Sequence, residues 1–395
     1  MKHIEKNHLL FYTYSALFSA GFLIISGTIL QTFMYESGLH EGRVSLFFSL
    51  SQILQTSIML LTSKWVEKVK NVVGLTALSV VGQLPMFLLM FYLSANRSLS
   101  SDTVFVLFMI LCVILSIAQG IGNTVSYKLP HHIMDIEDYG AVSGKSGVIV
   151  GIFGVTFMSL FTFTTNKLKY FYAMKIFIVI GFIFFAVSII TTFCYDRRQP
   201  KKIKNDGTNI NLFKYRPFYV LLLPNLLRGF STGIFTLMAV IGFSEKVLDS
   251  KGAVLISTLV QIATIVSCGI YAVFFSKKYN GIITFISTVV FAVTLPFCLI
   301  GKSSTVFIIS YTVAYIFFTF VSYAIPVIVA RHIDYECLGQ YTAWRMGLHT
   351  LGTALGSAAV PLLLKLVGGT GTMIICGLTL LPCGIMYYLF EKNWE

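Results

Sequence analysis

Residues 217–244 read PFYVLLLPNLLRGFSTGIFTLMAVIGFS, an apolar run that is long enough to cross a lipid bilayer as a helix. A membrane-spanning helix needs about 20 mostly apolar residues. Arg228 is the one charged residue of this run. It lies about twelve residues from the start, which is roughly 18 Å along a helix that rises 1.5 Å per residue. The stretch therefore predicts a transmembrane helix with an arginine near the middle of the membrane.

Eleven further stretches of the chain share this apolar character. The chain is 56% hydrophobic and 11% charged, whereas a soluble domain averages about 25% charged residues. Twelve spans use nearly the whole length, so the sequence predicts an all-α membrane protein without an additional soluble domain. The predicted spans are residues 9–35, 44–63, 71–96, 103–127, 139–166, 173–195, 217–244, 252–276, 281–301, 304–330, 340–364 and 366–390.

The basic residues predict the orientation of the chain in the membrane. If the N-terminus is cytoplasmic, the inside loops and termini hold seventeen of the 29 Lys and Arg, and the outside segments and the spans share the other twelve. Lys and Arg are enriched in cytoplasmic loops. We therefore expect a multi-pass protein of the inner (plasma) membrane of a bacterium, with both termini in the cytoplasm.

Two short motifs recur at corresponding places in the two halves of the chain. Phe11-Tyr12 opens the first span and Phe218-Tyr219 opens the seventh. An Asp-x-Glu pair follows the fourth span and another follows the tenth, 199 residues later; the four residues are Asp135, Glu137, Asp334 and Glu336. Parallel repeats of this kind are typical of a class of secondary transporters that bind substrate near the membrane midplane. The repeat predicts two pseudo-symmetric six-helix bundles, residues 1–195 and 217–395, joined by a basic cytoplasmic linker at 196–216.

Two motifs resemble those of the major facilitator superfamily: SKWVEKVK at 63–70, between spans two and three, and SIAQGIG at 116–122, in span four. The resemblance covers essentially the full length and implies alternating access by rocking of two bundles. It also implies that Glu67 and Lys68 bridge helices on the cytoplasmic side and stabilise one conformer. Ser116 stands where the family's exporters have an arginine, and span five lacks their Gly-Pro pair. Both departures weigh against drug export.

The loop between spans ten and eleven has a local likeness to the melibiose-type (glycoside-pentoside-hexuronide) sugar–cation symporters. It contains Asp334-Tyr335-Glu336, with Gly339 and Arg345 beyond. The sodium-binding aspartates of that group's early spans have no counterpart in this chain. The likeness leaves a sugar or glycoside symporter open as an alternative.

The spans contain basic residues but no carboxylate in their interior, which predicts an electropositive path. Burying a charge in a bilayer costs about 2.5–3.5 kcal/mol on insertion scales, so such residues usually face a cavity or a partner. A guanidinium can bind carboxylate or phosphate through two parallel hydrogen bonds. Asn225 precedes Arg228 by three positions on the same helix face, and Pro224 can interrupt the ladder of helical hydrogen bonds there. Alternatively, helix carbonyls or a neighbouring polar group satisfy Arg228.

Other polar residues are candidates for binding or for gating. His349 follows Arg345 by one helical turn and could couple transport to protons, although a lone histidine in a helix is more often simply hydrogen-bonded. Lys145 and Arg345 occupy nearly corresponding places in the repeat, each close in sequence to an Asp-x-Glu pair. The predicted substrate-binding residues are Arg228, Asn225, Lys145, His349, Asn123 and Gln31. The predicted gating residues are Glu67, Lys68, Asp135, Glu137, Asp334, Glu336 and Arg345.

Taken together, these patterns predict a secondary active or facilitative transporter of a small polar, anionic solute. Its expected partners are this solute, a coupling ion or counter-substrate, and membrane lipids; nucleic acid is not expected, and the chain is expected to be a monomer. Export of amphipathic drugs or lipid-like compounds is the alternative that the aromatic content favours. No catalytic cluster or nucleotide-binding loop is evident in the sequence, so we expect neither an enzyme nor a bound cofactor or metal.

Overall fold

The computed structural model describes residues 2–126, 129–134, 136–196, 216–275, 279–332 and 335–394. The chain divides into two compact units. Unit 1 consists of Met1–Arg43 and Leu50–Lys204, and unit 2 consists of Val44–Ser49 and Asn205–Glu395. Val44–Ser49 is a segment of helix α3, whose other residues belong to unit 1.

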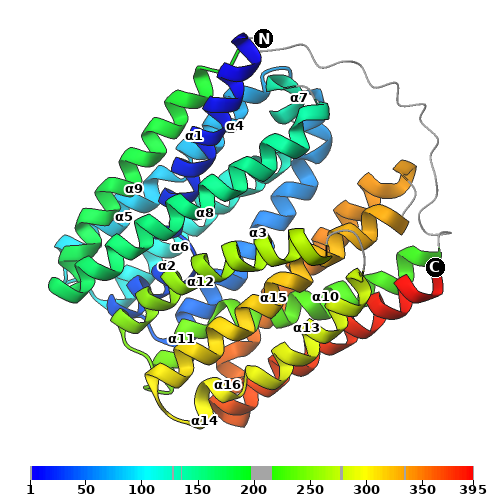
Figure 1. Ribbon diagram of the computed structural model, residues 1–395. Coiled ribbons are helices and arrows are strands. Elements are labelled where there is room, and N and C mark those ends of the chain that lie inside the picture. Colours follow the sequence, from blue (N-terminus) through cyan, green and yellow to red (C-terminus); the bar gives the residue numbers. More distant parts are fainter. Residues whose placement is uncertain are drawn as a thin grey trace. The chain divides into compact units, whose positions relative to one another are not determined.

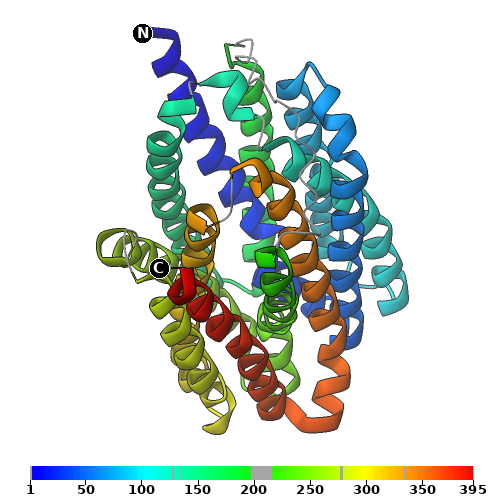
Figure 2. The same cartoon turned by 90° about the vertical axis from the view of Figure 1, so that its right-hand side faces the viewer.

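Unit 1 is a bundle of long apolar helices (Figure 1). Helix α1 packs against α8 and α9, and α4 packs against α6 and α9. The 90° view of Figure 2 shows the same helices running along one another. The helices are α1 (Lys2–Ile24), α2 (Gly27–Glu36), α3 (Glu41–Lys68), α4 (Val72–Val81), α5 (Leu84–Ala95), α6 (Ser101–Ser126), α7 (Leu129–Ile133), α8 (Ile136–Lys167) and α9 (Tyr170–Phe193).

Two of the spans predicted in unit 1 are each broken into two helices. The first is α1 followed by α2, and the break precedes Gly27, whose φ of +53° is a left-handed conformation that glycine adopts without steric cost. The third is α4 followed by α5, and Pro85 lies in the first turn of α5, where its missing N–H removes no helical hydrogen bond. A continuous apolar pattern predicted both spans without their breaks.

Phenylalanine rings fill the interior of unit 1 beside these breaks. Phe185 of α9 lies 5.1 Å from Phe18 of α1 and 5.0 Å from Phe87 of α5, measured between ring centroids. A side chain at Gly21 would meet the Phe185 ring, so α1 approaches α9 closely at this level. The interior is therefore apolar and tightly packed where these three helices meet.

Unit 2 contains the remaining helices of the described chain (Figure 1). Helix α13 packs against α15 and α16, and α10 packs along α16. They are α10 (Arg216–Thr236), α11 (Met238–Ser244), α12 (Ser250–Ile270), the short π-helix η2 (Tyr271–Phe275), α13 (Asn280–Thr294), α14 (Phe297–Ile300), α15 (Ser304–His332) and α16 (Tyr335–Trp394).

The seventh span contains a proline and a bend, and they lie at different positions. Pro224 lies inside α10, and the chain bends instead at Leu237, where α10 and α11 meet at 49°. Helix α10 therefore continues through Pro224. Neighbouring helices can re-satisfy the backbone groups that a membrane proline frees, so proline does not by itself fix the position of a bend.

The number of spans agrees with the prediction of twelve. Within the described residues, ten helices are long and apolar enough to cross a membrane, and the bent pair of α10 and α11 makes an eleventh span. The longest of the ten, α16, is interrupted at Gly368, whose φ of +69° and ψ of 179° are not helical. Dividing α16 there gives twelve, with the boundary three residues after the predicted position.

Candidate functional site

Glycines bring α10 and α16 into backbone contact in unit 2. A Cβ atom at Gly229 would clash with the carbonyl oxygen of His349, and one at Gly233 would clash with that of Thr353. From the other side, a Cβ at Gly352 would clash with the carbonyl of Leu226. Small residues permit this approach between membrane helices. Gly229 follows Arg228 directly in the chain, so the contact fixes the backbone of α10 at Arg228 against α16.

Arg228 is buried, with 8% of its surface exposed. Its Nη2 donates a hydrogen bond of 3.0 Å to Oγ of Ser322 on α15. The Ser322 hydroxyl in turn donates to the carbonyl of Phe318 at 3.1 Å, so it presents a lone pair to the arginine. Nε of Arg228 is buried without a hydrogen-bond partner among the described residues. Among the described residues, the guanidinium is therefore held at one nitrogen, and its Nε is a donor without an acceptor.

A second arginine, Arg345 of α16, lies in the same interior. It is also 8% exposed, and its Nε likewise has no hydrogen-bond partner among the described residues. Its Nη2 lies 4.0 Å from the Met346 sulfur, which is a weak acceptor. Arg228 and Arg345 lie within electrostatic range of each other and of His349. The sequence predicted Arg345 as a gating residue, and the structure brings it together with the predicted binding residues.

His349 connects the two helices through a threonine. Its Nε2 lies 3.3 Å from Oγ1 of Thr232, and that hydroxyl donates to the carbonyl of Arg228 at 2.8 Å. Because the threonine proton is used for the carbonyl, the geometry makes His349 the donor to Thr232. His349 therefore supports the backbone of α10 at the level of Arg228.

Asn225 and Tyr387 form a second polar contact beside this cluster. Nδ2 of Asn225 donates to the Tyr387 hydroxyl at 2.9 Å, and both side chains are fully buried. The Tyr387 hydroxyl and the Cys383 thiol lie within electrostatic range of both arginines. We call Arg228, Arg345, His349, Asn225 and Tyr387 the basic cluster.

The carboxylates described in unit 2 bind elsewhere. Glu245 accepts a hydrogen bond from the Gly369 N–H at 2.7 Å, and Asp249 accepts one from the Gly252 N–H at 2.8 Å. Glu391 accepts from the Gly281 N–H at the start of α13. Each therefore stabilises a helix end. Among the side chains that the structure describes, no carboxylate neutralises either arginine of the basic cluster.

This arrangement favours the binding of an anion. Two permanently charged guanidinium groups are buried within electrostatic range of each other, and an arginine does not lose its proton in proteins. Burying an unpaired charge is costly, and like charges repel each other in a low-dielectric interior. A negatively charged ligand would relieve both costs and take up the free donors.

Three of the predicted binding residues lie in unit 1. Gln31 is buried in α2, whereas Asn123 of α6 and Lys145 of α8 are exposed. The structure therefore brings Arg228, Asn225, His349 and Arg345 together within unit 2. The contribution of the unit 1 residues stays a prediction.

The predicted gating residues other than Arg345 are not tested by the described side chains. Glu67 and Lys68 lie at the end of α3, and Glu137 and Glu336 lie in the first turns of α8 and α16, but their side chains lie outside the described ones. Asp135 and Asp334 lie outside the described residues altogether.

Ser322 and Tyr387 are members of this site that the sequence did not indicate. Serine and tyrosine are common in membrane helices, and neither residue interrupts its apolar span in a distinctive way. Their roles depend on which helices pack together. Arg228 was the only sequence feature that pointed to such residues, because a buried guanidinium needs hydrogen-bond acceptors from other helices.

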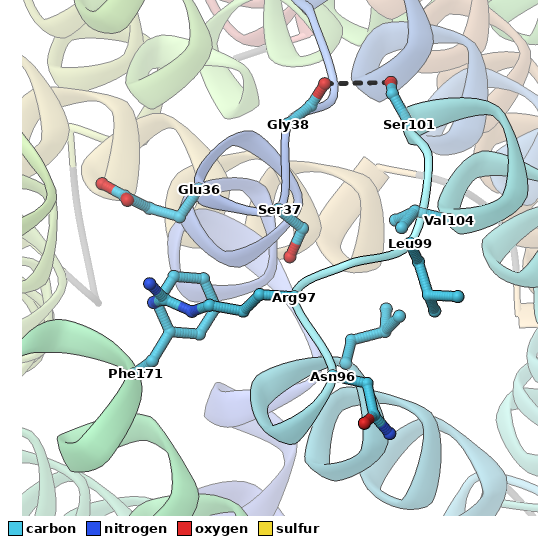
Figure 3. Close-up of a pocket in the computed structure, with 10 residues that line it drawn as sticks. Glu36, Ser37, Gly38, Asn96, Arg97, Leu99, Ser101, Val104 and Phe171 are labelled. Atoms are coloured by element: carbon cyan, nitrogen blue, oxygen red, sulfur yellow. Dashed lines mark hydrogen bonds between the residues drawn. The ribbon is translucent and has the colours of Figure 1, made fainter.

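Unit 1 has a separate cavity of about 340 Å³ at the ends of α2, α5, α6 and α9 (Figure 3). Arg97 lies over the ring of Phe171, 3.7 Å from its centroid, and Glu36 also lines the cavity. Both charged side chains are exposed. Water therefore solvates these charges, and the cavity lacks the buried charge that distinguishes the basic cluster.

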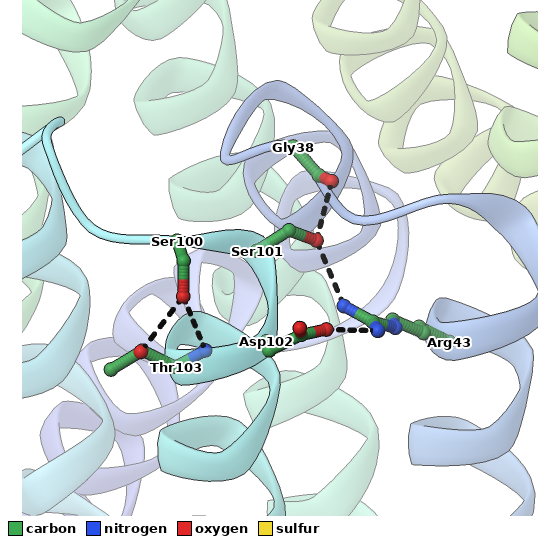
Figure 4. Close-up of polar contacts among 6 residues, drawn as sticks. All are labelled: Gly38, Arg43, Ser100, Ser101, Asp102 and Thr103. Carbon is green, nitrogen blue, oxygen red and sulfur yellow. Dashed lines mark hydrogen bonds and ion pairs between the residues drawn. The ribbon is translucent and has the colours of Figure 1, made fainter.

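A hydrogen-bonded group lies beside this cavity and joins α3 to α6 (Figure 4). Arg43 donates from Nη1 to Ser101 Oγ at 2.9 Å and forms an ion pair with Asp102. Ser101 Oγ in turn donates to the Gly38 carbonyl at 3.0 Å. Arg43 thus has a carboxylate partner, which suits a structural role.

Comparison with known proteins agrees with this architecture. The family model of the Major Facilitator Superfamily matches residues 11–336. No curated protein matches the chain in sequence. Similar solved structures include a D-xylose–proton symporter, with a TM-score of 0.72, 11% sequence identity and 98% of both chains covered. A mutant form of the nucleoside transporter NupG has a TM-score of 0.69 and 13% identity, with 98% of this chain and 100% of that chain covered. Another is the human organic anion transporter MFSD10, with a TM-score of 0.67, 12% identity, and 97% of this chain and 99% of that chain covered. At these identities the likeness shows the fold alone.

Proposed function

The chain belongs to the Major Facilitator Superfamily, and on that premise we propose that it carries a small organic anion across the membrane by alternating access. The chain is a multi-pass membrane protein of a transporter family. The proposed mechanism is rocking of two six-helix bundles, 1–195 and 217–395, about a substrate site. The linker at 196–216 would tether them.

The observation that carries this proposal is the pair of buried arginines without a described carboxylate partner. In a membrane interior such charges are costly and mark substrate or ion pathways. Arg228 is the proposed anchor, since Ser322 holds one of its nitrogens and no described residue accepts from its Nε. A carboxylate, phosphate or sulfonate fits the remaining donors through two parallel bonds.

The other predicted residues have supporting roles in this proposal. Asn225 and His349 would position the anchor and line its surroundings, while Lys145, Asn123 and Gln31 would contribute from unit 1. The similar solved structures transport different kinds of substrate, so they do not indicate the substrate of this chain. The proposal therefore rests on this chain's own residues.

We also propose how transport is driven and how the protein lies in the membrane. The spans contain no carboxylate, the group that usually binds a coupling proton or sodium ion. This absence favours exchange or uniport. If transport is coupled to protons, His349 is the candidate for the coupling group. The positive-inside distribution supports cytoplasmic termini in the inner (plasma) membrane. The proposed working unit is a monomer.

Uptake into liposomes tests the proposal. The purified protein is reconstituted, and vesicles preloaded with an unlabelled anion are exposed to the same anion carrying a radiolabel, across a panel of carboxylates, organophosphates and sulfonates. We expect accumulation of at least one anion, and loss of it with Arg228→Gln. Accumulation of only cationic, neutral or lipophilic compounds, with no effect of Arg228→Gln, would contradict the proposal and favour an exporter or a sugar symporter.

A further inference from the structure

We infer that the ligand of the basic cluster carries two negative charges, with one anionic group bound by Arg228 and the other by Arg345. This inference rests on the proposed function, because it takes the basic cluster to be the transport site. It adds the charge of the substrate, which the proposed function leaves open.

The first step is that the two guanidinium groups are separate binding groups. Arg228 is held by Ser322 of α15, whereas Arg345 contacts the Met346 sulfur at 4.0 Å. Neither Nε has a hydrogen-bond partner among the described residues. Nε and the adjacent terminal nitrogen form the edge that binds a carboxylate through two hydrogen bonds. Each arginine thus retains a free atom of this edge.

The second step is the charge balance within unit 2. Both arginines are 8% exposed, and Glu245, Asp249 and Glu391 are bonded to helix ends elsewhere. A singly charged ligand would neutralise one guanidinium and leave the other buried without a described counter-charge. A doubly charged ligand neutralises both, and it also removes the repulsion between them.

The third step is the rigidity of the pair. Gly229, Gly233 and Gly352 hold the backbones of α10 and α16 in contact beside Arg228, and Thr232 with His349 bridges the same two helices. The stems of the two arginines are therefore fixed relative to each other. A fixed pair of charges selects ligands whose two anionic groups have a matching separation, because a preorganised site needs no reordering on binding.

Matched ligand pairs that differ in one charge test this inference. Dicarboxylates of three to six carbons are compared with their monoamides, and organophosphates with their monomethyl esters, by titration calorimetry of the wild-type protein. We expect one dianion to bind at least tenfold more tightly than its singly charged partner. In Arg345→Gln the dianion and the monoanion should bind about equally tightly, while the affinity for the monoanion stays as in the wild type. The Arg43→Gln variant in unit 1 should keep the wild-type preference.

A second variant separates charge from geometry and guards against misfolding. Arg345→Lys keeps the positive charge but lacks the planar fork, so we expect it to retain a reduced preference for the dianion. Both Arg345 variants are first checked for a single symmetric peak in size-exclusion chromatography. Equal binding of dianion and monoanion to the wild type would overturn the inference and leave the proposed function standing. Binding of no anion would contradict both.

Discussion

The two units share a plan of helices but differ in what occupies their interior. Each breaks its first and third spans, at Gly27 and between α4 and α5 in unit 1, and at Leu237 and between α13 and α14 in unit 2. Phe11 and Phe218 open the first span of each unit and lie 207 residues apart; at the same spacing, Arg228 corresponds to Gly21. Gly21 packs against the Phe185 ring, whereas Arg228 is a buried charge.

The two units also differ in the exposure and pairing of their charged side chains. In unit 1 the ion pairs described are partly exposed, Lys6 with Asp196 and Arg43 with Asp102. In unit 2 Arg228 and Arg345 are buried and have no described carboxylate. The common plan accounts for the fold, and the position at which the units differ holds the arginine that we propose as the anion anchor. Variants that act on one unit or the other can break or sharpen this comparison.

The largest expected effect is on the glycine contact of unit 2. Gly229→Ala places a Cβ against the carbonyl of His349, so α10 and α16 must separate, and overpacking of this kind costs up to about 3 kcal/mol. Gly347→Ala on α16 is the matched control, since nothing lies within 4 Å of its added Cβ. Thermal unfolding in detergent should show a lower midpoint for Gly229→Ala alone. Equal midpoints for the two variants would contradict the packing described.

The next effect is on a polar contact of unit 1. Asn7 is fully buried, and its Nδ2 donates to the carbonyls of Ile133 at 2.7 Å and Asp196 at 2.9 Å. Its Oδ1 accepts from the Asp196 N–H at 3.0 Å. Asn7→Ala removes these hydrogen bonds and should lower stability by about 1–3 kcal/mol. The exposed Asn96, changed to alanine, should have little effect in the same unfolding measurement; a similar loss for both would show that the Asn7 contacts are not stabilising.

A smaller effect on stability, an increase instead of a decrease, is expected from a substitution in the basic cluster of the ligand-free protein. Arg228→Gln removes a buried charge that has no described counter-charge. Replacing a costly buried charge by a neutral group often stabilises a protein, here by about 1 kcal/mol. The unfolding midpoint of the ligand-free protein should therefore rise. A fall would mean that Arg228 is part of a stabilising network instead.

The smallest effect is expected for the matched arginine of unit 1. The Asp102 side chain is 81% exposed and that of Arg43 is 26% exposed, and exposed ion pairs contribute about 0–1 kcal/mol. Arg43→Gln should lower the midpoint slightly, and less so at high salt, because salt screens exposed charges. A rise like that expected for Arg228→Gln would remove the distinction between the two units.

The sequence predicted the spans and the arginine inside one of them because both depend on local composition. Twelve long apolar runs predict twelve helices, and one arginine inside such a run is conspicuous without any knowledge of the fold. The breaks were harder to predict: α10 continues through Pro224, and the bend at Leu237 has no proline. A bend depends on how neighbouring helices pack, which the pattern of one helix does not contain.

The composition of the site was only partly predictable for a related reason. Arg345 lies 117 residues beyond Arg228 and near the Asp-x-Glu pair, so sequence proximity favoured a gating role. It reaches the site because glycines on α10 and α16 bring those helices together. Ser322 and Tyr387 joined the site in the same way, through helix packing that no short motif indicates.

Ligand-induced stabilisation tests the central claim, that the basic cluster of unit 2 is an anion site, most directly. Thermal unfolding of the wild type, Arg228→Gln and Arg43→Gln is recorded with anionic, neutral and cationic metabolites. A ligand that binds only the native protein stabilises it by about 2.7 kcal/mol at a concentration a hundredfold above its Kd. We predict that anions stabilise the wild type and Arg43→Gln but not Arg228→Gln. Stabilisation by cationic or lipophilic compounds alone, equal in all three proteins, would contradict the account.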